Sequence, residues 1–302
     1  MDAQQNNSVL VTGGRGFIGR AVIELLQRSG YGVVSLDAAP PASSPNRHEV
    51  ACDLTDANEL QRVFATEQVG GIIHLAAILP TAAQREPARA TRVNVEGSLH
   101  LLEMARHFGV RRMVLGSSLS VYGTCSADQV VSETDRAAPE DLYGAAKLYV
   151  EQLGAAYCRS YGLEFVSLRI GRVVGSGAQS ASSAWRSQIF ELLATRHAAE
   201  ITLPYVESER ILLVHVEDVA KMLVALLQAA SPAHSLYNAA CESVIVADLK
   251  REVERLNPNI SVKLGEAQAL GNPRLLDSSR FGQEFGLPTL PIFEQLSRAA
   301  KE

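Results

Sequence analysis

Three glycines near the start of the chain, Gly13, Gly16 and Gly19, follow an apolar run at residues 8–11 and open a helical pattern at 17–28. In that setting the first glycine permits a tight turn, and the second lets backbone approach a pyrophosphate. The third lets the helix pack closely on the strand. The amino end of the helix adds unpaired N–H groups and a positive dipole. The spacing therefore predicts a dinucleotide-binding turn.

Apolar runs and helical patterns alternate through the first 170 residues. The runs carry no regular polar alternation, which is typical of strands buried on both faces of a parallel sheet. The runs lie at 8–11, 31–37, 71–77, 111–118 and 164–170, and the helical patterns lie at 17–28, 56–67, 85–108 and 141–160. This repetition with right-handed crossovers predicts an α/β fold built on a doubly wound parallel Rossmann sheet.

The alternation weakens after residue 170. A stretch rich in Gly and Ser at 171–183 precedes a helical pattern at 185–196, an apolar run at 211–216 and a further helix at 217–228. A length of 302 residues suits one domain plus a lobe. We therefore expect a Rossmann domain at residues 1–170, rejoined by 211–230. We expect a smaller substrate-binding lobe made of 171–210 and 231–302.

The composition and net charge argue against some classes of binding partner. The net charge of −5 argues against a nucleic-acid partner, and no run of about 18 apolar residues predicts a membrane span. The first eight residues contain neither Lys nor Arg and no apolar stretch, so they do not resemble a signal peptide. The cysteines lie far apart and the histidines lack metal-binding spacing. We expect a cytoplasmic protein that uses no metal and acts on a small polar molecule.

Asp37 ends the second predicted strand, 18 positions after Gly19. An acidic group there accepts hydrogen bonds from the hydroxyls of the adenosine ribose and repels a 2′-phosphate. The residues that follow, Ala38, Ala39 and Pro40, bring no cation. The pattern predicts NAD as the cofactor in preference to NADP. The alternative is an aspartate that only ends the strand in a turn.

Tyr143 and Lys147 stand four residues apart in a helical pattern, so both side chains lie on one face of a helix. A phenol with an ordinary pKa of about 10 is a poor base at neutral pH, and a neighbouring ammonium stabilises its phenolate. Ser118 ends a predicted strand, where parallel strands open onto a cofactor crevice. The three side chains form a candidate catalytic group, although Ser118 alone would also fit a simple turn.

The joint pattern resembles the extended short-chain dehydrogenase/reductase family, also called the NAD-dependent epimerase/dehydratase family, over about residues 8–230. It consists of TGGRGFIG, Asp37, Asp53-Leu54, HLAA at 74–77, Asn94 in VNVEG, SSLSVYG and YGAAK. The resemblance implies NAD as cofactor, with Asp53 and Leu54 against the adenine. The cofactor site that it implies comprises Gly13, Gly16, Phe17, Ile18, Gly19, Asp37, Asp53, Leu54, Leu75, Ala76, Ala77, Ser117, Tyr143 and Lys147.

The resemblance also implies roles in catalysis. Tyr143 would donate and accept the proton, Lys147 would hold the nicotinamide ribose and lower the pKa of the tyrosine, and Ser118 would orient the substrate. Asn94 is similar to the helix asparagine that supports the cofactor loop or a proton-relay water; the alternative is a plain helix residue. Family members usually pair through two helices each, here 85–108 and 141–160. We expect a homodimer, with a monomer as the alternative.

Two subgroups of the family match this chain less well. The 4,6-dehydratases carry an Asp-Glu pair after the catalytic serine, where this chain has Leu119 and Ser120. Nucleotide-sugar epimerases usually carry an asparagine three residues after the arginine of the LR strand end, where this chain has Arg172. The sequence therefore disfavours dehydration and puts a diphosphate pocket in doubt.

Arg172 is suited to hold a carboxylate by two parallel hydrogen bonds, assisted by Ser182, Ser183 and Arg186; a structural ion pair is the alternative. We predict substrate contacts from Ser118, Arg172, Ser183 and Arg210. The leading hypothesis is an NAD-dependent oxidoreductase that oxidises a secondary hydroxyl of a small sugar acid or sugar-like substrate. The alternatives are a nucleotide-sugar 4-epimerase and a non-catalytic dinucleotide-binding sensor.

Overall fold

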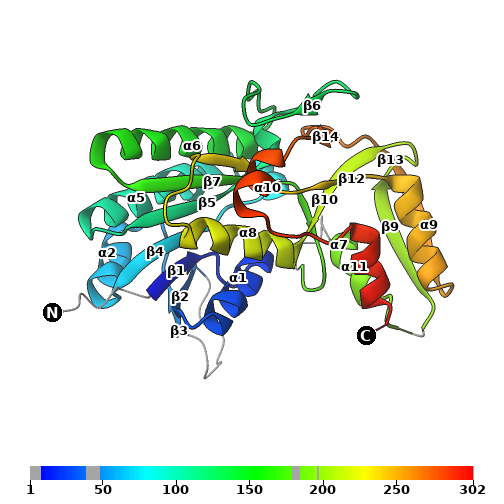
Figure 1. Ribbon diagram of the computed structural model, residues 1–302, viewed down its shortest axis with the longest axis horizontal. Helices are drawn as coiled ribbons and strands as arrows, with labels where there is room; N and C mark the ends of the chain where they lie inside the picture. Colours follow the sequence, from blue (N-terminus) through cyan, green and yellow to red (C-terminus); the bar gives the residue numbers. More distant parts are fainter. Residues whose placement is uncertain (1–7, 39–47, 179–183, 196, 302) are drawn as a thin grey trace.

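The computed structural model describes residues 8–38, 48–178, 184–195 and 197–301. Its centre is a parallel sheet with the order β11-β7-β5-β4-β1-β2-β3 (Figure 1). The strands are β1 (Ser8–Thr12), β2 (Gly32–Asp37), β3 (His48–Ala51), β4 (Val69–His74), β5 (Arg112–Ser118), β7 (Glu164–Ile170) and β11 (Leu236–Asn238). The strand order reverses between β1 and β4, and Rossmann sheets bind dinucleotides at such a reversal.

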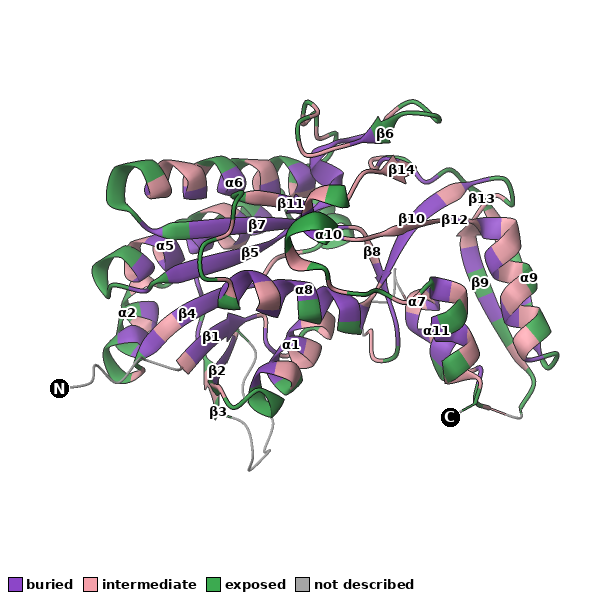
Figure 2. Cartoon of the chain, in the orientation of Figure 1, coloured by how far each residue is buried: buried purple, intermediate pink, exposed green. Residues whose placement is uncertain are grey.

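Helices cover both faces of this sheet. The helices α1 (Phe17–Arg28) and α8 (Val216–Gln228) lie on one face, and α2 (Ala57–Thr66), α5 (Gly97–His107) and α6 (Leu142–Tyr161) lie on the other. The central strands are therefore buried along their length (Figure 2), which explains why their sequences are apolar without alternation. The predicted α/β Rossmann fold is confirmed.

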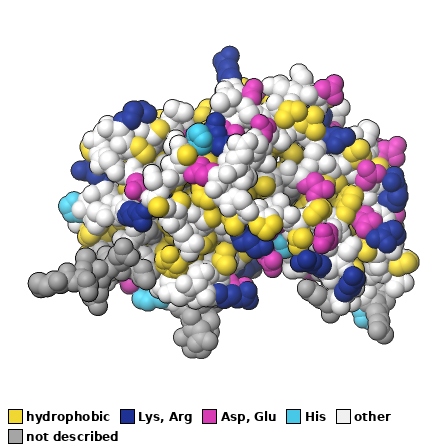
Figure 3. Space-filling model, in the orientation of Figure 1, with side chains coloured by type: hydrophobic (Ala, Val, Ile, Leu, Met, Phe, Trp, Pro, Cys, Tyr) yellow, Lys and Arg dark blue, Asp and Glu magenta, His cyan; other side chains and the backbone are white. Residues whose placement is uncertain are grey.

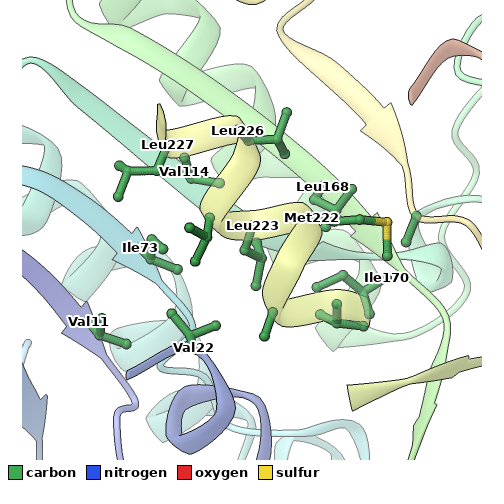
Figure 4. Packing of buried hydrophobic residues seen from close by; sticks show 14 of the residues in the cluster. Val11, Val22, Ile73, Val114, Leu168, Ile170, Met222, Leu223, Leu226 and Leu227 are labelled. Atoms are coloured by element: carbon green, nitrogen blue, oxygen red, sulfur yellow. The ribbon is translucent and has the colours of Figure 1, made fainter. Parts of the chain in front are cut away.

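Helix α8 closes one of the two cores of the sheet. Its Met222, Leu223, Leu226 and Leu227 belong to one cluster with side chains from β1, β4, β5 and β7 (Figure 4). Leu223 and Leu226 are fully buried. Burial of one leucine contributes about 1.5–3 kcal/mol, so packing holds α8 on a sheet whose first strands lie 200 residues earlier in the chain.

A buried arginine, Arg112 at the start of β5, closes the carboxyl end of α8. Its side chain is 1% exposed, and its guanidinium donates to the carbonyl oxygens of Leu226 (3.0 Å), Leu227 (3.0 Å) and Ala229 (2.5 Å). Nε donates to the Glu164 carboxylate at 2.8 Å. The last carbonyls of a helix have no partner within it, so Arg112 satisfies groups that would otherwise be buried unpaired.

A third core lies beside the Rossmann sheet, where the lobe packs its own strands and helices together. It contains a three-stranded sheet in the order β12-β10-β8 and the parallel pair β13–β9. The bounds are β8 (Arg172–Val174), α7 (Trp185–Glu191), β9 (Ala199–Tyr205), β10 (Arg210–His215), β12 (Glu242–Ile245), α9 (Val246–Leu256), β13 (Ile260–Ala267) and α11 (Ile292–Ala299). The remaining short elements are η2 (Leu119–Val121), β6 (Val130–Val131), β14 (Leu275–Leu276) and α10 (Ser279–Phe285).

The single helix expected over 85–108 is wrong. The chain forms α3 (Pro80–Arg85), α4 (Pro87–Thr91), a π-helical segment η1 (Arg92–Glu96) and then α5. Pro87 lacks an N–H and cannot continue α3, so it starts a new helix. The helix expected at 185–196 also ends early, at Glu191.

The expected division of the chain differs from the structure at two strands. The segment 211–230 was predicted to rejoin the Rossmann domain, but only α8 does so, since β10 pairs with β8 and β12. Conversely, β11 was assigned to the lobe and instead extends the main sheet beside β7. A strand of three residues has too short an apolar pattern for a sequence argument to place it.

The surface shows acidic and basic side chains interspersed over the face in Figure 3. On α9 they form pairs one helical turn apart, such as Lys250–Glu254 at 2.5 Å and Arg255–Glu252 at 2.7 Å. Within the described residues, no helix is long and apolar enough to cross a membrane. The same residues contain no group of three or more His, Cys, Asp or Glu side chains that could hold a metal ion.

Candidate active site

A cleft of about 880 Å³ opens at the carboxyl ends of β1, β2, β4 and β5. Cofactor pockets in proteins span about 300–1,000 Å³. Every residue of the predicted cofactor site lines this cleft, namely Gly13, Gly16, Phe17, Ile18, Gly19, Asp37, Asp53, Leu54, Leu75, Ala76, Ala77, Ser117, Tyr143 and Lys147. The fold thus collects the predicted residues from widely separated segments into one site.

The glycine turn leaves room for a phosphate group. Gly13 has a φ of +67°, and a Cβ added to Gly19 would lie 2.2 Å from the carbonyl oxygen of Gly13. Side chains at these positions would therefore distort the turn or collide with it. Helix α1 starts after Gly16 without a side-chain cap, and Gly16, Phe17 and Ile18 at its start line the cleft. These features fit the pyrophosphate of NAD.

Arg20 on α1 joins this turn to the lobe. Its guanidinium donates to the carbonyl oxygen of Arg15 within the turn at 2.8 Å, and to the carbonyl oxygen of Gly177 in the loop after β8. The next residue of that loop, Ala178, lines the cleft. The cofactor turn and the first loop of the lobe are thus held together by one side chain.

Two carboxylates mark the adenosine end of the cleft. Asp37 ends β2 and accepts the N–H of Arg15 at 3.3 Å. Asp53 accepts hydrogen bonds at 2.9 Å from both the N–H and the hydroxyl of Thr55. The placement fits recognition of ribose and adenine. Of the residues after Asp37, Ala38 lines the cleft, whereas Ala39 and Pro40 lie outside the described residues.

Tyr143 and Lys147 project from the first turns of α6, whose start is fixed by Asp141. The Asp141 side chain accepts the N–H of Gly144 at 2.6 Å. A Cβ on Gly144 would lie 2.5 Å from the carbonyl oxygen of Ser120, so only glycine lets the helix approach η2 this closely. The Lys147 ammonium is 5.7 Å from the centroid of the Tyr143 ring. Both side chains line the cleft, as the four-residue spacing predicts.

Ser118 combines the two roles that the sequence left open. Its hydroxyl oxygen accepts the N–H of Ser120 at 3.1 Å and so caps η2. It also hydrogen-bonds Tyr143, which favours the phenolate and lowers the pKa of that tyrosine. A substrate oxygen beside Tyr143 would therefore lie within reach of a serine hydroxyl that the turn itself holds in place.

Burial shifts the pKa values of Tyr143 and Lys147 in opposite directions. It raises the pKa of Tyr143 to about 12, against the opposing effects of Ser118 and the Arg186 guanidinium. Lys147 is 4% exposed, and its burial lowers its pKa to about 8, partly offset by the Glu151 carboxylate. Its ammonium donates to the carbonyl oxygen of Gly116 at 2.7 Å. The cation that acts on Tyr143 here is Arg186, whereas the sequence pointed to Lys147.

A Lys147→Met variant is expected to be more stable than the parent at about pH 7, by about 2 kcal/mol. Lowering the pKa from 10.5 to about 8 corresponds to a burial cost on the order of 3 kcal/mol, and losing the Gly116 hydrogen bond removes about 1 kcal/mol of the gain. The gain in stability of Lys147→Met is full below pH 8 and fades towards pH 10.5. Over that range Lys147 of the parent is already neutral in the folded state but still charged in the unfolded state, so its burial cost disappears. Denaturant unfolding at both pH values measures this. A less stable variant at pH 7 would contradict the account.

Ser117 and Asn94 hold the cleft in shape through hydrogen bonds. The Ser117 hydroxyl donates at 2.5 Å to Glu151, which also pairs with Arg169 at 2.7 Å. The Asn94 side chain accepts the N–H of Ile78 at 2.7 Å and donates to its carbonyl at 2.9 Å. Of the two family roles for Asn94, this geometry matches support of the cofactor loop.

Two arginines of the lobe also line the cleft. Arg172 and Arg186 both line it, and Arg172 Nε donates to the Tyr205 hydroxyl at 3.1 Å. Arg186 Nε is buried and has no hydrogen-bond partner among the described residues. Burial, with the neighbouring charge of Arg172, lowers the pKa of Arg186. Two cations side by side, one with a buried donor left over, form a site suited to an anion.

Two of the residues predicted to contact substrate, Arg210 and Ser183, are not among the described residues that line the cleft. Arg210 is not among the residues that line the cleft, because Leu213 is the residue opposite Arg172 in the pairing of β10 with β8. Arg210 lies three residues before Leu213 on β10, about 10 Å from that position. Ser183, like Ser182, lies outside the described residues. Substrate contact by Arg210 stays a prediction, and the lining of the cleft does not include this residue.

Sequence reasoning missed two cleft residues from the end of the chain. Leu270 and Asn272 line the cleft from the connection between β13 and β14. Leu270 is 58% exposed, as is typical of a cleft rim. They belong to no motif, so only the folded chain reveals them.

The fold and site were compared with known proteins. A model of the NAD dependent epimerase/dehydratase family matches residues 9–240. The chain is 34% identical over 176 residues to a UDP-glucose 4-epimerase of Lacticaseibacillus casei, covering 56% of this chain and 52% of that protein. It is 30% identical over 167 residues to a uronate dehydrogenase of Pseudomonas syringae pv. tomato, covering 55% and 59%. The match thus spans little more than half the length of these relatives.

Solved structures share the fold over almost the whole chain. The holo form of an L-threonine dehydrogenase of Cupriavidus necator has a TM-score of 0.88 at 21% identity, covering 97% of this chain and 99% of that one. A UDP-glucose 4-epimerase of Thermus thermophilus in complex with NAD has a TM-score of 0.82 at 24% identity, covering 97% and 98%. Identities this low show the fold alone. On its family match over residues 9–240, the chain belongs to the NAD dependent epimerase/dehydratase family of extended short-chain dehydrogenases/reductases, with NAD as the cofactor.

Proposed function

We propose that this chain is an NAD-dependent dehydrogenase that oxidises a secondary hydroxyl of a small hydroxy acid of the sugar-acid type. The observation that carries the proposal is the pair Arg172 and Arg186 in the same cleft as Tyr143. A guanidinium binds a carboxylate through parallel hydrogen bonds. Uronates and threonine, named in two of the relatives, are both hydroxy-carboxylates.

The residues of the cleft can move the proton that such an oxidation releases. Ser118 holds the substrate hydroxyl, and Tyr143 as phenolate accepts its proton while the carbon becomes a carbonyl. Bound NAD⁺ supplies the acceptor for the hydride that leaves this carbon. Arg186 brings positive charge to the phenolate and opposes the effect of burial on the pKa of Tyr143. In reduction, Tyr143 returns the proton to the forming alkoxide.

The proposal is tested by NADH formation with free substrates. We expect NADH to accumulate when the protein and NAD⁺ meet a panel of uronates, aldonates and hydroxy amino acids. A nucleotide-sugar 4-epimerase, favoured by the 34% identity to a UDP-glucose 4-epimerase, would instead interconvert a sugar nucleotide and release no NADH. Interconversion without any NADH from the acids would overturn the dehydrogenase proposal. Bound NAD with no turnover of either class would favour the sensor.

Arg186→Gln is expected to raise the KM for the acid by about 10- to 100-fold, because a hydrogen bond to a charged group contributes about 1.5–3 kcal/mol. It also removes a charge that lowers the pKa of Tyr143, so the rise of activity with pH should move to higher pH. The matched control is Arg251→Gln, an exposed arginine on α9, which should change neither value. Equal KM values in the two variants would contradict the carboxylate site.

We also infer a homodimer formed through α5 and α6. Their outer sides carry exposed apolar and aromatic residues, with Leu99 36%, Tyr149 54% and Tyr161 57% exposed. Exposed apolar groups gathered on neighbouring helices are typical of subunit contacts. Light scattering on the protein in solution should give twice the mass of the chain, and Tyr161→Asp should lower it to that of one chain.

A further inference from the structure

A file of hydrogen bonds runs behind the wall of the cleft from the last residue of β1 to η1. Thr12 Oγ1 lies 2.7 Å from His74 Nδ1, and His74 Nε2 lies 2.8 Å from Ser98 Oγ. The Ser98 hydroxyl donates to the carbonyl oxygen of Asn94 at 2.7 Å. All four residues are between 0% and 4% exposed. Because water does not reach them, these groups depend on one another for hydrogen bonds.

The direction of every bond in the file is determined. The Ser98 hydrogen goes to a carbonyl, so the Ser98 oxygen accepts from His74, and Nε2 is the nitrogen that carries the hydrogen. Burial, with the charge of Lys147, lowers the pKa of His74 to about 3, so the ring is neutral. Its Nδ1 is then an acceptor and takes the hydrogen of the Thr12 hydroxyl.

Both ends of the file hold the segment 75–78. The oxygen of the Thr12 hydroxyl, having donated its hydrogen, accepts the N–H groups of Leu75 and Ala76 at 3.2 Å each. At the other end the Asn94 side chain pairs with both backbone groups of Ile78. All four residues of this segment line the cleft. One polar file therefore anchors the wall of the cofactor site at both of its ends.

We propose that Thr12, His74 and Ser98 are positioning residues that fix segment 75–78 for the binding of NAD. The inference deepens the proposed function and rests on it, since it concerns how the same cleft holds the cofactor. None of the three touches the reacting atoms. Their effect should therefore appear in cofactor affinity, and only weakly in the rate at saturating cofactor.

The test compares Thr12→Val with Thr12→Ser by calorimetric titration with NAD⁺ in the absence of substrate. Valine keeps the shape of threonine but leaves the Ala76 N–H and the imidazole Nδ1 unpaired. The Leu75 N–H keeps its other bond, to the main-chain carbonyl oxygen of residue 12 at 3.1 Å. Each unpaired group costs about 1–3 kcal/mol, so we expect Kd to rise at least about tenfold. Thr12→Ser restores the hydroxyl and should stay within about twofold of the parent. Where turnover is measurable, kcat at saturating NAD⁺ should change less than Kd.

Ser35→Ala serves as the matched control. Ser35 is a buried serine on the neighbouring strand β2, and its hydroxyl has no hydrogen-bond partner among the described residues. The Kd of the Ser35→Ala variant for NAD⁺ should equal that of the parent. If Thr12→Val does not fold, Ser98→Ala at the other end of the file decides the question. We expect this variant to raise the Kd for NAD⁺ about threefold or more.

The inference is overturned if Thr12→Val, or Ser98→Ala in its place, binds NAD⁺ as tightly as Ser35→Ala. It is overturned equally if Thr12→Ser is as weak as Thr12→Val, since bulk and not the hydroxyl would then matter. The proposed function fails in a different way, when the parent binds NAD⁺ but oxidises no acid. In that case the calorimetric comparison still decides the role of the file.

Discussion

The Tyr143→Phe variant is expected to lose turnover by about 10²- to 10⁴-fold, the range that a positioned acid–base group contributes. The phenol of Tyr143 is the group in the cleft whose pKa is lowered by the hydrogen bond with Ser118 and by the charge of Arg186. Phenylalanine keeps the ring and its packing, so affinity for NAD⁺ should change less than threefold, on the order of RT. Steady-state NADH formation measures the first value, and calorimetric titration measures the second.

Tyr149→Phe is the control for this loss. Tyr149 lies on the same helix, six residues later, and is 54% exposed. Removal of its hydroxyl should leave kcat and KM unchanged. Full activity in Tyr143→Phe would exclude the phenol as the base and leave the protein a binder of NAD. Loss of NAD binding together with activity would instead indicate a collapsed cleft.

The Arg112→Met variant is expected to lower the free energy of unfolding by about 3–5 kcal/mol. The change leaves the carbonyls at the end of α8 buried without donors, and each unpaired group costs about 1–3 kcal/mol. Natural domains are stable by only about 5–15 kcal/mol, so the loss is large. Urea unfolding at constant m-value measures it.

The neighbouring Arg111 supplies the comparison. Its guanidinium reaches Ala229 and Ala230 from the surface, and its side chain is 56% exposed. Water can replace it, so Arg111→Met should cost less than about 1 kcal/mol. Arg112→Lys should recover part of the loss because one ammonium can still serve some of the carbonyls. Equal losses for Arg111→Met and Arg112→Met would show that burial of the donor is not the cause.

The Rossmann half of the chain was predictable because its information is local. The glycine turn, the apolar strands and the four-residue spacing of Tyr143 and Lys147 each lie within one short segment. Every residue expected to hold the cofactor lines the observed cleft. Pro87 is the local signal that was overlooked, since it separates α3 from α4.

The lobe could not be predicted to the same depth because its sheets join distant segments. The pairing of β8 with β10 decides that Arg172 enters the cleft and Arg210 does not, and no local pattern encodes that register. Arg186 is placed by the packing of α7 in the lobe core, and Leu270 and Asn272 come from a turn without a motif. The Tyr143 environment shows the same limit, because the cation that lowers its pKa comes from α7.

The bridge from Arg20 to Gly177 has a consequence for laboratory evolution. Arg20 holds both the glycine turn and the loop after β8, so a substitution in that loop made to alter substrate specificity should also act on the cofactor turn. A chimera that takes the first 120 residues from one parent and the rest from another would inherit the two halves of the bridge from different sources. Such hybrids should keep both ligands only when the donor of position 20 and the loop at 177 are exchanged together.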